Sequence, residues 1–374
     1  MFNSFFLAGY DCTATYNVNR EWINNTSATQ HDHFLDHDYY LLNSVGIRAV
    51  REGICWSRVD SNGKYDFTPL SRLLDASKRH NIEVIYDLCH FGYPDGLDIF
   101  SAEFTNRFAD YCYAVARYIS TRTDSNCAFT PINEPSYFSW AAGDEGLFRP
   151  YQKGRSFDIK VCLAKAAIAG IDAIRAACPS ARIINVDPIC RCVAPHDNPE
   201  LQSEADIFND VIVFQCWDML GGRLLPELGG SRAHLGVIGM NYYWTNQWEL
   251  GCPNIPLRED DCRRWPLSDL VRTAWQRYGG EVLITETSHI GEGRARWLRE
   301  VTSGAEAMLS SGIPLKGICL YPILGMPAWH TKEYLPMGLW DLELYGTELR
   351  RVPHVPTLEV LREAQRLEGR QWVE

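Results

Sequence analysis

Apolar residues follow two patterns that alternate along the chain. Short apolar runs, such as the one at residues 82–88, are bounded by polar residues or glycine and predict buried strands. Longer segments space their apolar residues three or four positions apart, as between Phe104 and Ile119, and predict amphipathic helices. An alternation of buried strands with amphipathic helices is typical of a parallel sheet covered by helices.

The alternation extends from one end of the chain to the other. Strands are predicted at residues 5–10, 47–51, 82–88, 129–132, 182–187, 235–243, 281–285 and 315–321. Helices are predicted at residues 38–44, 70–79, 104–119, 159–178, 205–220, 268–278, 293–311 and 357–367. Eight strands alternating with eight helices predict a (β/α)8 (TIM) barrel of the α/β class. Because no linker or internal repeat interrupts the series, we expect residues 1–374 to form a single catalytic domain.

Composition and charge exclude several classes of partner. Hydrophobic residues make up 46% of the 374 residues and charged residues 22%, as in globular proteins. The net charge of −11 offers no basic surface for phosphate groups, which argues against a nucleic-acid partner. No apolar run is long enough to span a membrane, and the amino terminus shows no signal peptide. The odd count of 13 cysteines indicates reduced thiols, so we expect a cytoplasmic protein. We expect no membrane partner, and a homo-oligomer is possible.

Two glutamates end predicted strands on opposite sides of the chain's midpoint. Glu134 lies in Asn133-Glu134-Pro135, where the proline prevents the fourth strand from continuing, and Glu286 follows the apolar run of the seventh strand. An Asn or Glu at a strand end often only caps the next helix. In a TIM barrel, however, the carboxyl ends of the strands carry the active site. The fourth and seventh strands would bring both carboxyl groups to the separation of about 5–5.5 Å that a retaining glycosidase needs.

The sequence resembles the family 1 β-glycosidases of clan A in six segments that occur in the family's order. Two of them match the acid/base motif (Asn133-Glu134-Pro135) and the nucleophile motif (Ile284-Thr285-Glu286). The other four resemble segments of the second, third, sixth and eighth strands: residues 50–58, 88–91, 239–243, and Tyr321 with residues 338–341. The resemblance implies a retaining hydrolase of a β-linked glycoside that uses no cofactor and no metal.

The resemblance also implies roles for individual residues. Glu286 would be the nucleophile, held ionised by Arg51, and Glu134 would be the proton donor and later the base. Tyr243 would orient Glu286; we prefer it to Tyr242 because it shares a strand face with Asn241.

Other residues would bind the sugar itself. Asn133 would bind the 2-hydroxyl of the sugar, and His90 another hydroxyl. Trp329 lies where the family has a sugar-stacking tryptophan, although it fits a loop anchor equally well.

The departures from the family are concentrated where its members recognise the sugar. The loop at residues 10–16 lacks the usual glutamine, Ala328-Trp329 replaces the usual Glu-Trp pair, and Gly96 stands where a tryptophan is common. Lys332-Glu333-Tyr334 resembles the Lys-x-Tyr that binds phosphate in 6-phospho-β-glycosidases, although the accompanying serine is absent. The sugar and the aglycone therefore stay open, including an acidic or modified sugar.

Two other activities fit the same residues. A transglycosylase would use the same covalent intermediate with a sugar acceptor in place of water. A non-hydrolytic carbohydrate-binding barrel would not need a paired acid and nucleophile, which counts against it.

Two clusters of metal-ligand type have simpler explanations. The polar segment 31–38 is expected to be a solvated loop that caps the first helix, and Cys190-Arg191-Cys192 lacks a second cysteine pair at zinc spacing.

Overall fold

The protein forms a closed barrel of eight parallel strands, seen in a computed structural model that describes residues 2–123, 127–253 and 255–371. The strands follow one another around the barrel in chain order. They are β1 (Phe6–Gly9), β4 (Ala49–Gly53), β7 (Glu83–Asp87), β8 (Ala128–Thr130), β9 (Arg182–Pro188), β11 (Val237–Asn241), β13 (Val282–Thr287) and β14 (Leu315–Leu320). Parallel pairing of β14 with β1 closes the ring, which confirms the predicted (β/α)8 fold.

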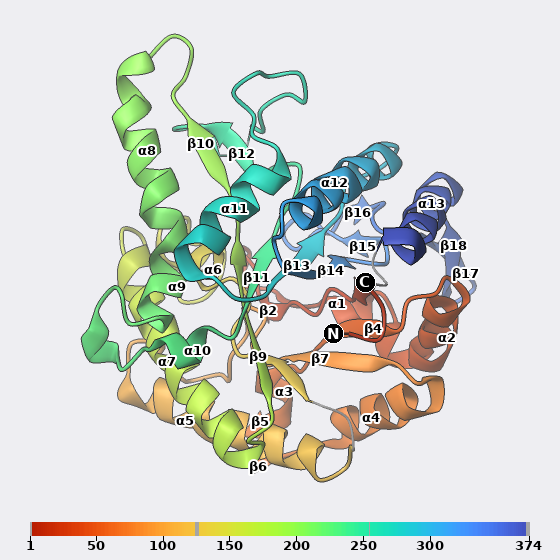
Figure 1. Cartoon of the computed structure of the whole chain (residues 1–374). Helices are drawn as coiled ribbons and strands as arrows, with labels where there is room; N and C mark the ends of the chain where they lie inside the picture. The colour runs from red at the N-terminus through yellow and green to blue at the C-terminus, as the bar shows by residue number, and fades with distance from the viewer. Residues whose placement is uncertain (1, 124–126, 254, 372–374) are drawn as a thin grey trace.

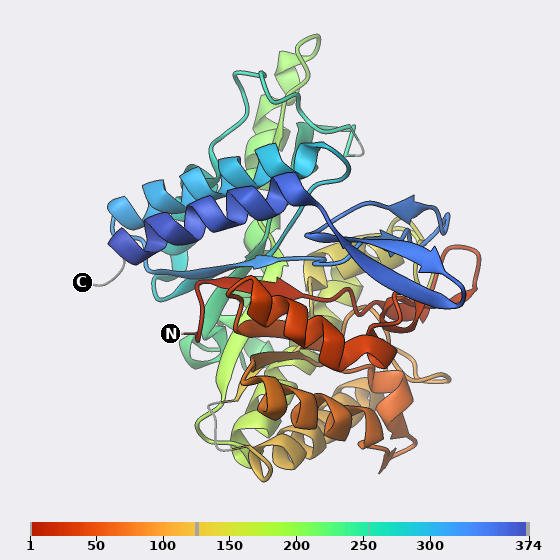
Figure 2. The same cartoon turned by 90° about the vertical axis from the view of Figure 1, so that its right-hand side faces the viewer.

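Helices surround the strands, as Figures 1 and 2 show. The outer ring consists of α2 (His31–Ser44), α4 (Thr68–His80), α5 (Ala102–Ser120), α7 (Ser156–Ala177), α8 (Gln202–Asp210), α9 (Gln215–Leu220), α11 (Leu267–Tyr278), α12 (Gly293–Ser310) and α13 (Val355–Gln371). In both views α12 and α13 lie side by side, and α8 projects away from the barrel. No helix in the described part of the chain is long and apolar enough to cross a membrane.

Short elements decorate the loops. The two-stranded sheets pair β2 (Ala14–Tyr16) with β3 (Trp22–Asn24), β5 (Asp60–Ser61) with β6 (Lys64–Tyr65), β10 (Arg191–Val193) with β12 (Gln247–Glu249), β15 (Met326–Pro327) with β16 (Tyr334–Leu335), and β17 (Trp340–Tyr345) with β18 (Glu348–Pro353). The short helices are α1 (Asn25–Ala28), α3 (Trp56–Val59), α6 (Pro135–Gly143) and α10 (Arg232–Leu235), with 3₁₀ turns η1 (Pro199–Leu201), η2 (Ile212–Phe214) and η3 (Pro226–Leu228).

Two predicted helices differ from the structure. The helix predicted at residues 205–220 is interrupted, because Val211 leaves the helical conformation and η2 separates α8 from α9. The run Val211-Ile212-Val213 is β-branched, and such side chains crowd the preceding helical turn. The other difference is the start of α2, which begins at His31 rather than at Asp38, so the predicted polar loop at residues 31–38 is wrong.

A buried charge network explains the polar residues at the start of α2. The His31 ring lies 2.7 Å from Asp38 and 3.1 Å from Glu52 on β4, and Arg351 on β18 donates to Asp38 at 2.6 and 2.9 Å. Burial lowers the pKa of His31, but the two carboxylates outweigh it and raise that pKa to about 9. This network ties α2 to β4 and β18.

Strand periodicity places polar side chains at one end of the barrel. Ala49 and Ile85 belong to the apolar cluster inside the barrel. Residues two positions apart on a strand point the same way, so Arg51 and Asp87 also face the barrel axis, one layer nearer the carboxyl ends of the strands. The interior thus changes from an apolar core to a layer of buried charges at the end where TIM-barrel enzymes place their active sites.

Candidate active site

A β-bulge aims Glu286 into the barrel. Thr285 and Leu283 share a strand face, so a regular strand would turn Glu286 outward, toward the helices. The pairing of β11 with β13 shifts after Met240, and Asn241 pairs with Glu286. Thr285 is the extra residue of this bulge. It donates to Asn241 at 2.6 Å, and Glu286 still reaches the polar layer.

Two donors hold the Glu286 carboxylate. Arg51 donates one guanidinium N–H to Glu286 Oε1 in a short ion pair, and Tyr243 donates its hydroxyl to Glu286 Oε2 at 2.8 Å. The other end of the Arg51 fork donates to Asn133 Oδ1 at 2.6 Å and to Asp87 Oδ2 at 2.7 Å. Burial lowers the pKa of Arg51, but Asp87 and Glu286 raise it well above its usual value, so the guanidinium stays charged.

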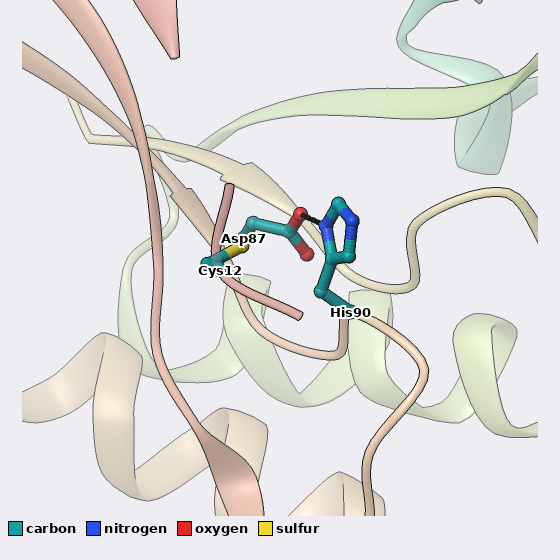
Figure 3. Close-up of side chains that lie close together, drawn as sticks. All are labelled: Cys12, Asp87 and His90. Carbon is teal, nitrogen blue, oxygen red and sulfur yellow. Dashed lines mark hydrogen bonds and ion pairs between the residues drawn. The ribbon is translucent and has the colours of Figure 1, made fainter. Parts of the chain in front are cut away.

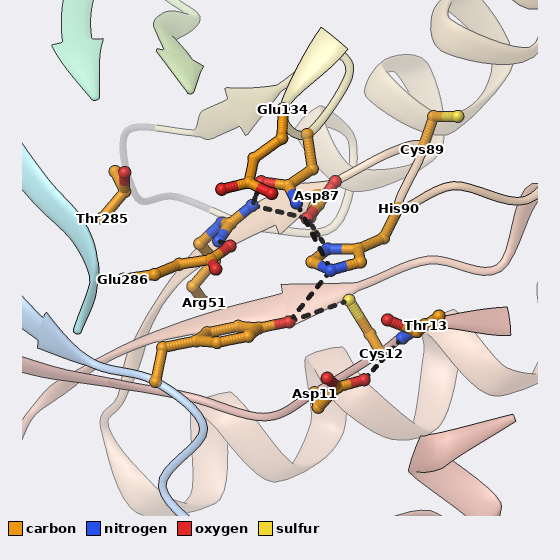
Figure 4. A network of polar contacts seen from close by, with 12 residues as sticks. Asp11, Cys12, Thr13, Arg51, Asp87, Cys89, His90, Glu134, Thr285 and Glu286 are labelled. Carbon is orange, nitrogen blue, oxygen red and sulfur yellow. Dashed lines mark hydrogen bonds and ion pairs between the residues drawn. The ribbon is translucent and has the colours of Figure 1, made fainter. Parts of the chain in front are cut away.

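Glu134 reaches the same network through an unusual backbone conformation (Figure 4). Its φ is 44°, in the left-handed region that non-glycine residues rarely adopt. The preceding bridge aligns Asn133 with Val186 of β9, and Pro135 starts α6 immediately afterwards. The Glu134 N–H donates to the Val186 carbonyl at 3.0 Å, which fixes the turn. Backbone strain of this kind clusters at functional sites.

The surroundings of Glu134 favour a protonated carboxyl group. Burial, then the charge of Glu286, raises the pKa of Glu134 to about 8, and Asp187 adds to the rise. The Asn241 side chain opposes it by donating to Glu134 Oε1 at 2.8 Å. Glu134 and Glu286 therefore share one buried site but face opposite kinds of partner.

His90 is held by a carboxylate that the sequence did not single out. Asp87 Oδ2 lies 2.8 Å from His90 Nδ1 and also accepts from Arg51. The other ring nitrogen, Nε2, lies 3.3 Å from Asn133 Nδ2 and 3.5 Å from the Tyr321 hydroxyl. Asp87 ends its strand three residues before His90, and an acidic residue at a barrel-strand end was the signal available in the sequence.

Trp329 lies in an aromatic cluster formed by loop residues and the start of α6. Its ring packs 5.7 Å from Phe91, 6.3 Å from Tyr137 and 5.8 Å from Phe148, measured between ring centroids. Its indole N–H donates to Asp11 Oδ2 at 3.3 Å, which links the loop after β14 to the loop after β1. These contacts match the loop-anchor alternative, and they involve Asp11, a residue that the sequence did not single out.

Lys332 and Tyr334 both contact other parts of the chain, and a phosphate site at this pair stays a prediction. Lys332 Nζ lies 2.6 Å from Glu21 at the surface. The Tyr334 hydroxyl accepts from the Leu342 N–H at 2.6 Å and donates to Asp341 at 3.3 Å. Both polar groups are therefore engaged with other parts of the chain.

One group of metal-ligand type occurs in the described residues, and Figure 3 shows it. Cys12, Asp87 and His90 bring one ligand atom each within 4.8 Å of the others. Asp87 Oδ2 already accepts from Arg51 and His90, and burial raises the pKa of the Cys12 thiol, which favours its protonated form. Hydrogen bonding accounts for this cluster without an ion, and the absence of a metal and cofactor stays a prediction.

Solved structures share the whole architecture. A β-glucosidase from Thermotoga maritima in complex with glucoimidazole is 14% identical, with a TM-score of 0.76 over 97% of this chain and 98% of that chain. A hyperthermophilic β-glucosidase mutant that forms a dodecamer in the crystal is 13% identical, with a TM-score of 0.77 over 96% and 99% of the two chains. A further β-glycosidase is 19% identical, with a TM-score of 0.71 over 91% and 87%.

The sequence itself also matches a known family. The model of the family described as "Glycosyl hydrolase family 1" matches residues 10–209, a range that contains Arg51, His90, Asn133 and Glu134. This range is more than half of the 374-residue chain. The protein is therefore a glycoside hydrolase and belongs to glycosyl hydrolase family 1.

Proposed function

We propose that this glycoside hydrolase cleaves a β-linked glycoside with retention of configuration, by double displacement. Glu286 is the nucleophile and Glu134 is the acid/base. The observation behind the proposal is the unequal distribution of donors. Glu286 accepts from Arg51 and Tyr243, whereas among the described residues Glu134 accepts a side-chain hydrogen bond only from Asn241 and faces the charge of Glu286.

In the first step, Glu286 attacks the anomeric carbon while Glu134 protonates the leaving oxygen. Attack requires an ionised carboxylate, and hydrogen bonds from Arg51 and Tyr243 favour that form. Protonation requires a neutral acid, and a pKa of about 8 keeps Glu134 protonated at neutral pH. The glycosyl–Glu286 ester forms, the glycosidic bond breaks, and the aglycone leaves with the proton from Glu134.

The second step reverses the roles. Esterification removes the negative charge of Glu286, so the pKa of Glu134 falls and Glu134 becomes a base. It takes a proton from water, the hydroxyl attacks the anomeric carbon, and Glu286 leaves as a carboxylate. A sugar acceptor in place of water would give transfer instead of hydrolysis by the same atoms.

The buried side chains around the pair supply the proposed sugar contacts. Asn133 Oδ1 accepts from Arg51, which leaves the Nδ2 group to donate to the sugar 2-hydroxyl. His90 Nε2 has only longer contacts, at 3.3 and 3.5 Å, which an incoming hydroxyl can replace. We propose a small glycoside as substrate, and the β-glucosidases of the same fold support this class.

The test is covalent labelling. A panel of aryl β-glycosides identifies a sugar that the enzyme turns over, and the matching 2-deoxy-2-fluoro glycoside traps the intermediate. We expect peptide mass analysis to locate the label on Glu286, and Glu286→Gly to remain unlabelled. A label on another residue, or turnover without any trapped ester, contradicts the proposal. Product analysis with added sugar acceptors separates hydrolysis from transfer.

The location of the enzyme and its assembly stay predictions. The 13 cysteines are consistent with a cytoplasmic location. One structural relative forms a dodecamer in its crystal, an assembly described for that relative and not for this chain.

A further inference from the structure

Asp187 reaches the first turn of α6 from a neighbouring strand. It lies near the carboxyl end of β9, and its side chain is buried. Asp187 Oδ1 accepts from the Ser136 N–H at 2.9 Å, and Asp187 Oδ2 accepts from the Ser136 hydroxyl at 2.5 Å. Ser136 is the second residue of α6, and the Glu134 side chain at the N-cap makes no capping bond. Asp187 therefore supplies the cap that this helix lacks locally.

These bonds bear directly on the backbone of Glu134. Hydrogen bonds hold the left-handed backbone of Glu134 on both sides. The Val186 carbonyl accepts from the Glu134 N–H, and the Asp187 carboxylate accepts from Ser136 in the first turn of α6. Val186 and Asp187 are consecutive on β9, so one strand holds both sides of the turn. A shift of this turn would move the Glu134 carboxyl group relative to Glu286.

Asp187 also places a negative charge beside Glu134. Burial raises the pKa of Asp187 to about 6, against the Ser136 hydrogen bonds and the positive charge of Lys160 on α7. Asp187 is therefore ionised at the pH where Glu134 titrates, near 8. The other groups that act on Glu134 are Glu286, which also raises its pKa, and Asn241 and His90, which lower it.

We propose that Asp187 is a positioning residue for Glu134: it fixes the turn through Ser136, and its charge keeps the proton on Glu134. The proposal rests on the proposed role of Glu134 as acid/base. Glu286 loses its charge when the glycosyl ester forms, whereas Asp187 keeps its charge through both steps. Asp187 therefore keeps Glu134 a stronger base in the second step than it would be with Glu286 neutralised and no other carboxylate nearby.

Asp187→Asn tests the charge separately from the hydrogen bonds. Asparagine can accept from the Ser136 N–H and donate to the Ser136 hydroxyl, so the turn keeps its cap while the charge disappears. Removing a negative charge lowers the pKa of Glu134. We expect the alkaline limb of kcat/KM for an unactivated aryl glycoside to move to lower pH by about one unit.

Ser136→Ala is the complementary variant. It removes the bond from the hydroxyl but leaves the Asp187 charge in place. We expect a lower kcat without a move of the alkaline limb to lower pH. Asp218→Asn, which removes a buried aspartate of α9 that pairs with Arg277, is the control for loss of a buried carboxylate and should leave the limb in place.

A titration without turnover separates this proposal from the proposed function. Carbon-13 NMR of protein labelled at the glutamate carboxyl carbon follows Glu134 directly, with Glu134→Gln to assign its signal. The midpoint should fall in Asp187→Asn and stay in place in Asp218→Asn. An unchanged midpoint in a folded Asp187→Asn variant overturns the role of Asp187, whatever the labelling of Glu286 shows. A failure to label Glu286, with a shifted midpoint, overturns the catalytic assignment instead.

Discussion

Glu134 and Glu286 are the same residue type in one buried site, yet Glu286 is surrounded by hydrogen-bond donors and Glu134 by negative charge. Glu286 is bound by a guanidinium and a phenol, both donors. Glu134 has one amide donor and lies near two carboxylates, Glu286 and Asp187. One chain thus surrounds two identical side chains with opposite kinds of partner, hydrogen-bond donors at Glu286 and carboxylates at Glu134.

The two glutamates also reach the site by different local structures. Glu286 turns inward through the bulge at Thr285, which keeps an otherwise regular strand. Glu134 turns inward because its own backbone adopts the left-handed conformation in the turn between the short strand β8 and α6. Sheet pairing thus fixes Glu286, the proposed nucleophile, and a helix start that Asp187 caps fixes Glu134, the proposed acid/base.

The largest expected effect is a loss of activity that depends differently on the leaving group in variants of the two glutamates. Glu286→Gly removes the proposed nucleophile, and we expect kcat to fall by roughly a thousandfold or more on every aryl glycoside. Glu134→Ala removes only the proposed proton donor, so activity in the first step should fall far less on glycosides of acidic phenols than on glycosides of weakly acidic phenols. A plot of kcat/KM against the pKa of the phenol measures this. Equal losses for both variants across the series would contradict the assignment.

Arg51→Lys tests the donor side of the comparison. Lysine keeps a positive charge but cannot donate in a fixed fork to Glu286, Asp87 and Asn133 together. We expect the rate of labelling by the fluoro-sugar to fall by about a hundredfold, because the Glu286 carboxylate is no longer held in position for attack.

Arg277→Lys is the matched control for Arg51→Lys. Arg277 lies on the outer helix α11 and pairs with Asp218, so its substitution should leave the labelling rate unchanged. Wild-type labelling by a folded Arg51→Lys variant would show that Arg51 is structural only.

The barrel could be predicted from the sequence because it depends on short-range patterns, whereas the site residues were proposed from a resemblance to family motifs. Strand and helix periodicities gave all eight barrel strands, and the motif residues Arg51 and Glu134 do lie in one network. What the sequence could not provide was the set of partners. An aspartate at a strand end, such as Asp87 or Asp187, is indistinguishable from a helix cap until the barrel closes and brings another strand beside it.

The bulge at Thr285 and the break after α8 were missed for a related reason. Both depend on which neighbour a segment packs against, and local propensity does not specify that neighbour. The sugar-binding side shows the same limit. Trp329 was left open between a sugar platform and a loop anchor, and its contacts with Asp11 and Phe91 became apparent only in three dimensions.

Tyr243→Phe removes one of the two donors to Glu286. A hydrogen bond to a charged group contributes roughly 1.5–3 kcal/mol, so we expect kcat/KM to fall by about 10- to 100-fold. Tyr242→Phe is the matched control, since the Tyr242 hydroxyl accepts from Gln247 at 3.0 Å on the opposite side of the strand end and its ring stacks on Trp297. A larger kinetic effect in Tyr242→Phe than in Tyr243→Phe would reverse the assignment of the two tyrosines.

The smallest expected effect is on stability and follows from the pKa of Glu134. That pKa is about 8 in the folded protein, above the ordinary value of about 4.3. A raised pKa means that folding favours the protonated form, so the contribution to stability is complete below about pH 4 and is lost as the pH rises through 8. Glu134→Gln is neutral at every pH and can still accept from Asn241. We therefore expect its melting temperature to exceed that of the wild type by a few degrees at pH 8.5 and to match it near pH 4.5.

Glu286→Gln extends the same measurement to the other glutamate. It takes a carboxylate partner away from the buried Arg51, so we expect its melting temperature to fall below that of the wild type near pH 4.5, where Glu134→Gln should match the wild type. A stability gain of similar size and pH dependence in both variants would mean that the two glutamates share one environment, and the distinction between the donor-bound nucleophile and the carboxylate-flanked acid would fail.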